Sequence, residues 1–133
     1  MNPLEAVADA IMKFEGWAPG TRSYVNRNPG NLEGGQYKDD RGYNVYKSLC
    51  EGYTALVADL FDKFTGNNKH GLGPKSTVIQ LMSVYAPPSE NPTLSYAEFL
   101  AGWLTKALGK PISPTSELGE IYNVEIPTPQ RSG

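Results

Sequence analysis

The stretch that decides the fold runs from Pro3 to Gly16 and reads PLEAVADAIMKFEG. Asn2, just before it, can accept a backbone hydrogen bond as an N-cap, and Pro3 suits the first helical position. Apolar residues then recur with the i, i+3, i+4, i+7 spacing of an amphipathic helix. They are Leu4, Val7, Ala8, Ile11 and Phe14. The stretch therefore predicts a helix over residues 3–15 that ends at Gly16.

Glu15 closes this helix on its apolar face, directly after Phe14. A carboxyl group against apolar surface loses hydration, which raises its pKa, and the negative end of the helix dipole acts in the same direction. A carboxylic acid that stays protonated near neutral pH can act as a general acid on a glycosidic oxygen. The alternative is a boundary glutamate that reaches water or pairs with Arg22 or Arg27, because structural carboxylates outnumber catalytic ones.

Residues 16–47 carry no helical stripe and are rich in Gly, Asn and Tyr. The tetrapeptide Asn28-Pro-Gly-Asn31 is a strong turn signal, since Pro presets the second turn position and Gly accepts a positive φ at the third. The stretch from Tyr43 to Tyr46 is consistent with a short strand. We therefore expect a small, irregular β-hairpin region with loops.

Helical signals return at Ser48, which forms a capping box with Glu51 ahead of a second apolar stripe. Further helical stretches follow, separated by Gly and Pro residues. The expected helices span residues 48–65, 76–86 and 95–108, the last capped by Ser95 with Glu98, and a final helical turn is expected near 116–121. The fold class is thus mainly α, with about four to five helices and one β-hairpin or loop region after the first helix.

The length of 133 residues suits one domain, which we assign to residues 1–125, with a flexible tail at 126–133. A net charge of −2 argues against a nucleic-acid binder. The chain holds one Cys and one His, which excludes a disulfide framework and makes a metal site unexpected. No apolar run is long enough to span a membrane, and the first residues lack the pattern of a signal peptide. We expect a monomer without cofactor or metal.

The loop after the first helix offers flat rings and amide groups, which suit a saccharide. Its candidate binding residues are Trp17, Tyr24, Asn26, Asn28 and Asn31. The alternative is that the asparagines simply build turns. Asn31, immediately after the turn, is the one that a purely structural role explains least well.

A proline-rich connection with the sequence YAPPSENPTLSY offers three further binding residues, Tyr85, Asn91 and Tyr96, on a groove that faces Glu15. The alternative is a stiff connector between two helices, flanked by core tyrosines.

A glycoside hydrolase also needs a second acid, for which the hairpin region offers Glu33, Asp39 and Asp40. Each of these is equally consistent with a solvated turn residue. His70 is expected in an exposed loop, and no partner marks it or Cys50 as part of a catalytic dyad.

Taken together, three features resemble the lysozyme superfamily, which includes goose-type and phage lysozymes and the lytic transglycosylases. They are the helix that ends in Phe14-Glu15-Gly16, the segment Asn26-Arg-Asn-Pro-Gly-Asn-Leu32, and the segment Tyr85-Ala-Pro-Pro-Ser-Glu-Asn91. Within that superfamily, the chain most resembles small bacterial and phage proteins of lysozyme-like type. The resemblance covers about residues 5–108. The order and spacing of the motifs carry it, since each motif alone is weak.

The resemblance implies an α+β lysozyme-like fold and a peptidoglycan-cleaving glycosidase, either a lytic transglycosylase or a muramidase, that acts in the periplasm or cell wall. Glu15 would be the general acid, residues 28–32 would line the cleft floor, and Tyr85, Asn91 and Tyr96 would line the groove. One alternative is a non-catalytic lysozyme-fold protein that binds glycan or serves a phage particle or secretion machine. Another is action on a related β-1,4 aminosugar polymer such as chitin, because one fold hosts many functions.

Overall fold

Helices dominate the part of the chain that the computed structural model describes, residues 2–85 and 93–122. They are α1 (Pro3–Phe14), α2 (Arg22–Val25), α3 (Leu49–Thr65), α4 (Val78–Tyr85), α5 (Thr93–Leu108) and α6 (Leu118–Ile121). The mainly α class is therefore confirmed. The expected tail at 126–133 lies outside the described residues.

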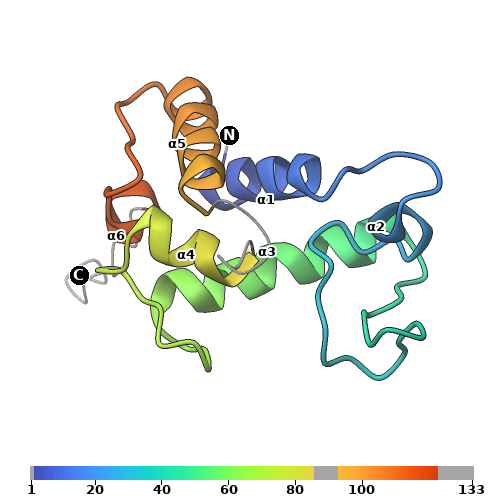
Figure 1. Ribbon diagram of the computed structural model, residues 1–133. Coiled ribbons are helices and arrows are strands. Elements are labelled where there is room, and N and C mark those ends of the chain that lie inside the picture. Colours follow the sequence, from blue (N-terminus) through green and yellow to red (C-terminus); the bar gives the residue numbers. More distant parts are fainter. Residues whose placement is uncertain (1, 86–92, 123–133) are drawn as a thin grey trace, which may run out of the picture.

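One apolar core joins all of these helices except α2. α1 packs against both α3 and α5, α4 packs against α5, and α6 packs against α3. In Figure 1 the long helix α3 runs beneath α1 and α4, and the irregular segment that contains α2 lies at the end of α3 farthest from α6. This arrangement brings the end of α1 close to that irregular segment.

Caps in the sequence set the beginnings of the two best-predicted helices. Asn2 Oδ1 accepts a hydrogen bond from Leu4 N at 2.7 Å, which caps α1. Ser48 Oγ accepts one from Glu51 N at 3.1 Å, which caps α3. Gly66, with φ of +100°, ends α3 in the left-handed conformation that favours glycine.

Three details differ from the sequence prediction. The short helix α2 was not expected, and α5 begins at Thr93, before the predicted cap at Ser95. The expected hairpin is reduced to two isolated antiparallel bridges among the described residues, Glu33 with Tyr43 and Lys38 with Asn44.

Side chains explain why this region does not form a regular ladder. Asn44 Oδ1 accepts the backbone N–H of Gly35 at 2.6 Å. Asp39 Oδ1 accepts those of Arg41 and Tyr43, each at 2.9 Å. Backbone groups satisfied in this way are no longer available to a neighbouring strand.

Candidate active site

Glu15 stands at the C-terminal end of α1, where its backbone N–H still bonds to Ile11 O at 2.9 Å. Its side chain is partly buried. Burial raises the pKa of this carboxyl group above its ordinary value of 4.5, and a hydrogen bond from Asn31 opposes that rise without cancelling it. The carboxyl group therefore holds its proton to a higher pH than an exposed glutamate does.

Asn31 is the partner that the structure gives Glu15. Its Nδ2 donates to Glu15 Oε1 at 2.8 Å. Asn31 has φ of +48°, a left-handed conformation that asparagine tolerates better than most residues. Its other amide atom, Oδ1, is buried and has no hydrogen-bond donor among the described residues.

Asn28 fixes the turn that carries Asn31. Its buried amide donates to Leu32 O and to Asn44 O, each at 2.9 Å. Its Oδ1 accepts from Leu32 N at 2.9 Å. Three bonds from one buried side chain hold both ends of the turn, so Asn28 has a structural position, and it does not line the cleft described below.

Two glycines let this turn pack closely against α3. A Cβ atom on Gly52 would lie 1.9 Å from the backbone oxygen of Arg27, and one on Gly30 would lie 2.6 Å from a methyl group of Leu56. Position 52 therefore needs glycine, because the backbone oxygen of Arg27 cannot rotate away, whereas a side chain at position 30 would require the Leu56 side chain to shift. The close packing determines how far Asn31 reaches toward Glu15.

Glu15 and Asn31 line a cleft of about 470 Å³, which we call the Glu15 cleft. Its walls come from the end of α1, the turn after α2, the middle of α3, the α3–α4 loop and the end of α4. The lining residues are Glu15, Gly30, Asn31, Leu32, Glu33, Tyr43, Asp59, Lys63, Lys69, His70, Val84 and Tyr85. The volume falls within the range of about 300–1,000 Å³ that is usual for small-ligand sites.

A partly buried ionic network forms the α3 side of the Glu15 cleft. Asp59 Oδ2 accepts a hydrogen bond from the hydroxyl group of Tyr85 at 2.7 Å and forms an ion pair with Lys63. Lys63 is only 5% exposed, and its ammonium group lies 5.4 Å from the centre of the Tyr85 ring. Burial, followed by the charge of Asp59, raises the pKa of Tyr85 well above its ordinary value, so its hydroxyl group stays protonated.

The cleft brings together only some of the predicted binding residues, Asn31 and Tyr85 with Glu15. Trp17 and Tyr24 pack on each other with ring centres 5.1 Å apart and do not line it. The ring of Tyr96 packs on the ring of Phe14, the last residue of α1, with ring centres 4.9 Å apart. Asn91 lies outside the described residues.

Asp39 and Asp40 also lie away from the residues that line the cleft. Asp39 accepts hydrogen bonds from Arg22 and from Asn26 Nδ2, the latter at 2.9 Å. Partial burial favours a higher pKa for Asp39, but hydrogen bonds from Asn26, two backbone N–H groups and Arg22 outweigh it and lower the pKa well below its ordinary value. The Asp40 side chain is 92% exposed. Of the three candidate second acids, Glu33 is the one that lines the Glu15 cleft.

Sequence reasoning missed Asp59 and Lys63 and assigned no role to Lys69 or His70. A signal was available on α3, because Lys63 follows Leu56 by seven residues and Asp59 by four. Position i+7 belongs to the buried stripe of a helix, so a lysine there indicates a charge that needs a partner. Asp59, one turn earlier, is that partner.

Within the described ranges, no three His, Cys, Asp or Glu side chains come together in a way that could hold a metal ion. No helix in the same ranges is long and apolar enough to cross a membrane. Comparison of the chain with protein-family models, with curated proteins and with solved structures gives no match.

Proposed function

We propose that this chain is a lysozyme-like glycosidase that cleaves the β-1,4 bond between MurNAc and GlcNAc in peptidoglycan, with Glu15 as the general acid. The observation that carries the proposal is the partly buried carboxyl group of Glu15, whose pKa is raised, in the wall of a cleft of about 470 Å³. A protonated carboxyl group in a cleft is what cleavage of a glycosidic bond requires. In this proposal the chain acts as a monomer, without metal or cofactor, in the periplasm or cell wall.

Asn31 supports a substrate that carries amide groups. Its buried Oδ1 has no donor among the described residues, and an unsatisfied buried oxygen costs about 1–3 kcal/mol. The N–H of an N-acetyl group is a donor of the kind this oxygen lacks, and it would reach the oxygen once the Asn31 side chain turns toward the cleft. Both sugars of peptidoglycan carry such a group, and both would bring it into the Glu15 cleft.

The reaction starts with transfer of the Glu15 proton to the glycosidic oxygen. The bond between that oxygen and C1 of MurNAc breaks, and GlcNAc leaves with a free 4-hydroxyl group. Glu15 is then a carboxylate, which accepts the proton of the group that attacks C1. With the C6 hydroxyl group of the same sugar as nucleophile, the product is a 1,6-anhydro ring and Glu15 regains its proton. One carboxyl group suffices for this route.

A water molecule as nucleophile gives a reducing end instead, and that route needs a second acid. Glu33 is the acid that supports it, since it lines the same cleft while Asp39 is held in the loop by hydrogen bonds. We favour the one-carboxyl route, because the Glu33 side chain is exposed and forms no ion pair or hydrogen bond with any described residue.

Mass spectrometry of the soluble products released from purified peptidoglycan sacculi tests the proposal. Anhydro-muropeptides identify a lytic transglycosylase, and reducing muramic ends identify a hydrolase. The Glu15→Gln variant is the matched control and should release neither. If the parent protein releases nothing and only sediments with the sacculi, cleavage is refuted and the chain is a glycan-binding protein.

A further inference from the structure

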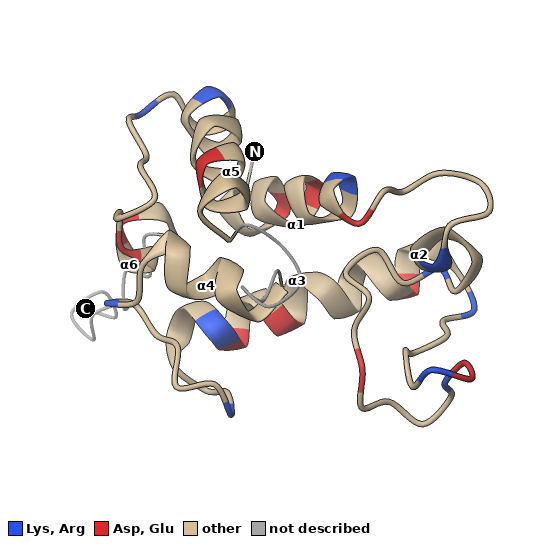
Figure 2. Cartoon of the chain, in the orientation of Figure 1, with Lys and Arg blue, Asp and Glu red and all other residues tan. Residues whose placement is uncertain are grey.

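Charged residues divide the Glu15 cleft into two walls of different character. Glu15 and Glu33 lie on the segments that follow α1 and α2, whereas Lys69 and His70 lie on the loop that joins α3 to α4. Figure 2 shows acidic residues at the end of α1 and in the loop beyond α2, and a basic residue at the tip of the α3–α4 loop. A ligand that spans the cleft therefore meets a proton donor on one side and nitrogen donors on the other.

Among the residues that the structure describes, the side chains of Lys69 and His70 have no hydrogen-bond or ion-pair partner. Both residues are exposed, and neither side chain forms a hydrogen bond or ion pair with any described residue. Lys63, deeper on the same side, differs because Asp59 neutralises it. No other side chain in residues 2–85 and 93–122 therefore engages the nitrogen groups at the rim.

Asn68 holds the loop that presents these two residues. Its Nδ2 donates to Asp62 O at 3.0 Å and to Leu72 O at 2.8 Å. Its Oδ1 accepts from His70 N and from Leu72 N, each at 3.1 Å. Four bonds to one side chain close the loop around Lys69 and His70, so a ligand would bind there at a lower cost in conformational entropy.

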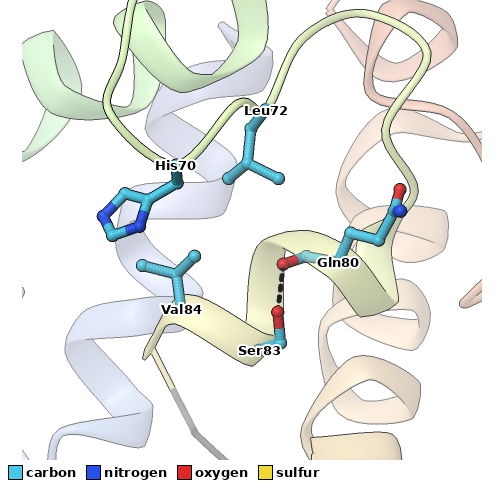
Figure 3. A pocket seen from close by; sticks show the side chains of 5 residues that line it. All are labelled: His70, Leu72, Gln80, Ser83 and Val84. Atoms are coloured by element: carbon cyan, nitrogen blue, oxygen red, sulfur yellow. Dashed lines mark hydrogen bonds between the residues drawn. The ribbon is translucent and has the colours of Figure 1, made fainter.

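His70 and Val84 also line a second hollow, which adjoins the Glu15 cleft and has a volume of about 500 Å³. Its other lining residues are Leu72, Gln80 and Ser83. Figure 3 shows His70 on the loop beside Val84 of α4, with Leu72 between the loop and the helix. Because the two hollows share His70 and Val84, a branch on a bound sugar has space to continue past the rim.

We propose that Lys69 and His70 form an anion subsite that binds a carboxylate on a side branch of the glycan, and so select muramic acid over plain N-acetylglucosamine. This inference rests on the proposed function. Two sources supply the carboxylate: the lactyl group of muramic acid itself, and the peptide stem attached to it. The Lys69 ammonium group supplies charge and the His70 imidazole supplies a directed N–H donor.

Isothermal titration calorimetry on the Glu15→Gln background tests the subsite without turnover. The probes are a GlcNAc–MurNAc tetrasaccharide with free lactyl groups, the same tetrasaccharide with peptide stems, and chitotetraose, which has no carboxylate. Each probe is titrated into the background protein, into a double variant with Lys69→Gln and His70→Gln, and into a control with Lys75→Gln. Lys75 is an exposed lysine of the same connection that does not line the cleft.

The subsite predicts that the double variant binds at least one carboxylate probe about 10- to 100-fold more weakly, the effect of losing charge-assisted hydrogen bonds. Chitotetraose affinity should stay within about twofold, and the Lys75→Gln control should match the background protein for every probe. Lys69→Arg with His70 intact should retain most of the affinity. The probe that loses affinity, with or without the peptide stem, identifies the source of the carboxylate.

Two results would overturn the subsite. If the double substitution weakens the binding of all three probes equally, or of none of them, Lys69 and His70 do not bind the carboxylate. The proposed function is unaffected by that result. If none of the three probes binds to the background protein, the proposed function and the subsite fail together. Circular dichroism of each variant confirms that the surface substitutions leave the fold intact.

Discussion

Asn31 Nδ2 donates a hydrogen bond of 2.8 Å to Glu15 Oε1, so an amide on a tight turn holds one oxygen of an acid at the end of a helix. Burial and this hydrogen bond act on the pKa of Glu15 in opposite directions. Burial of Glu15 favours its protonated form, whereas the bond from Asn31 favours the carboxylate. A general acid that donates its proton and then recovers one must be stable in both its protonated and its ionised form. Burial supports the first form and the hydrogen bond from Asn31 supports the second.

Substitution of Glu15 by glutamine should separate catalysis from stability. The amide keeps the shape and cannot donate a proton, so release of soluble muropeptides should fall by about 100-fold or more. The pKa of Glu15 is raised in the folded protein, so the folded state binds this proton more tightly than the unfolded state does. Parent stability should therefore decline as the pH rises from 4.5 to the folded-state pKa, and then level off.

The Glu15→Gln variant lacks this decline, so at neutral pH its melting temperature should equal or exceed that of the parent. Differential scanning calorimetry between about pH 4 and pH 8 provides the measurement. Glu98→Gln, at an exposed position on α5, is the control for loss of one negative charge. Full cleavage by the Glu15→Gln variant would show that another group is the acid.

Removal of the Asn31 amide should shift the pH dependence of cleavage. The Asn31 hydrogen bond lowers the pKa of Glu15, so Asn31→Gly should raise that pKa further. The basic limb of the kcat/KM profile, which reports loss of the acid's proton, should move to higher pH. Glycine is the substitution of choice, because it accepts the positive φ at position 31 without strain. A profile with an unmoved basic limb would contradict a link between Asn31 and the acid.

Close packing of the turn on α3 gives a prediction with an internal control. Gly52→Ala places a methyl group 1.9 Å from the backbone oxygen of Arg27, so the turn must move. We expect a loss of about 1–3 kcal/mol in the free energy of unfolding and lower activity, because Asn31 moves with the turn. Gly102→Ala on α5 meets no atom within 4 Å, and should instead gain about 0.5–1 kcal/mol from better helix propensity. Urea unfolding of the two variants gives both values, and equal stabilities would refute the close contact.

The long helices could be predicted because their signals are local. Asn2 and Ser48 cap α1 and α3 as the sequence indicated, and apolar stripes carry both helices into the core. α2 was not predictable in the same way. It has four residues, and Thr21 at its N-cap makes no side-chain capping bond, so the tertiary contacts of this segment must stabilise it.

In the candidate site, too, local features could be predicted from the sequence and tertiary contacts could not. Glu15 was identified from the apolar face of its own helix, and Asn31 from its place after a turn. The contact between them crosses 16 residues of irregular chain, and its geometry depends on where Asn28 and Gly52 fix the turn. Local pattern does not encode such a distance. Lys63 and Asp59 were the exception, since their spacing on α3 was readable and was missed.

Asp39 offers the last prediction, because it distinguishes a residue that builds the loop from one that takes part in cleavage. Its carboxylate accepts hydrogen bonds from Arg22, from Asn26 and from two backbone N–H groups, and its pKa is well below the ordinary 3.8. A lowered folded-state pKa means that the charged form stabilises the fold above pH 3.8, and that this contribution is lost as the pH falls below it. Asp39→Asn should therefore melt at a lower temperature than the parent at pH 7, and the difference should shrink in acid. Asp40→Asn next to it, with a side chain 92% exposed, should melt like the parent at both pH values.

The same variant also tests whether Asp39 takes part in cleavage. Below its melting temperature, Asp39→Asn should still cleave sacculi, since Asp39 does not line the Glu15 cleft. A folded Asp39→Asn protein without activity would instead make Asp39 the second acid and move the reaction to the water route.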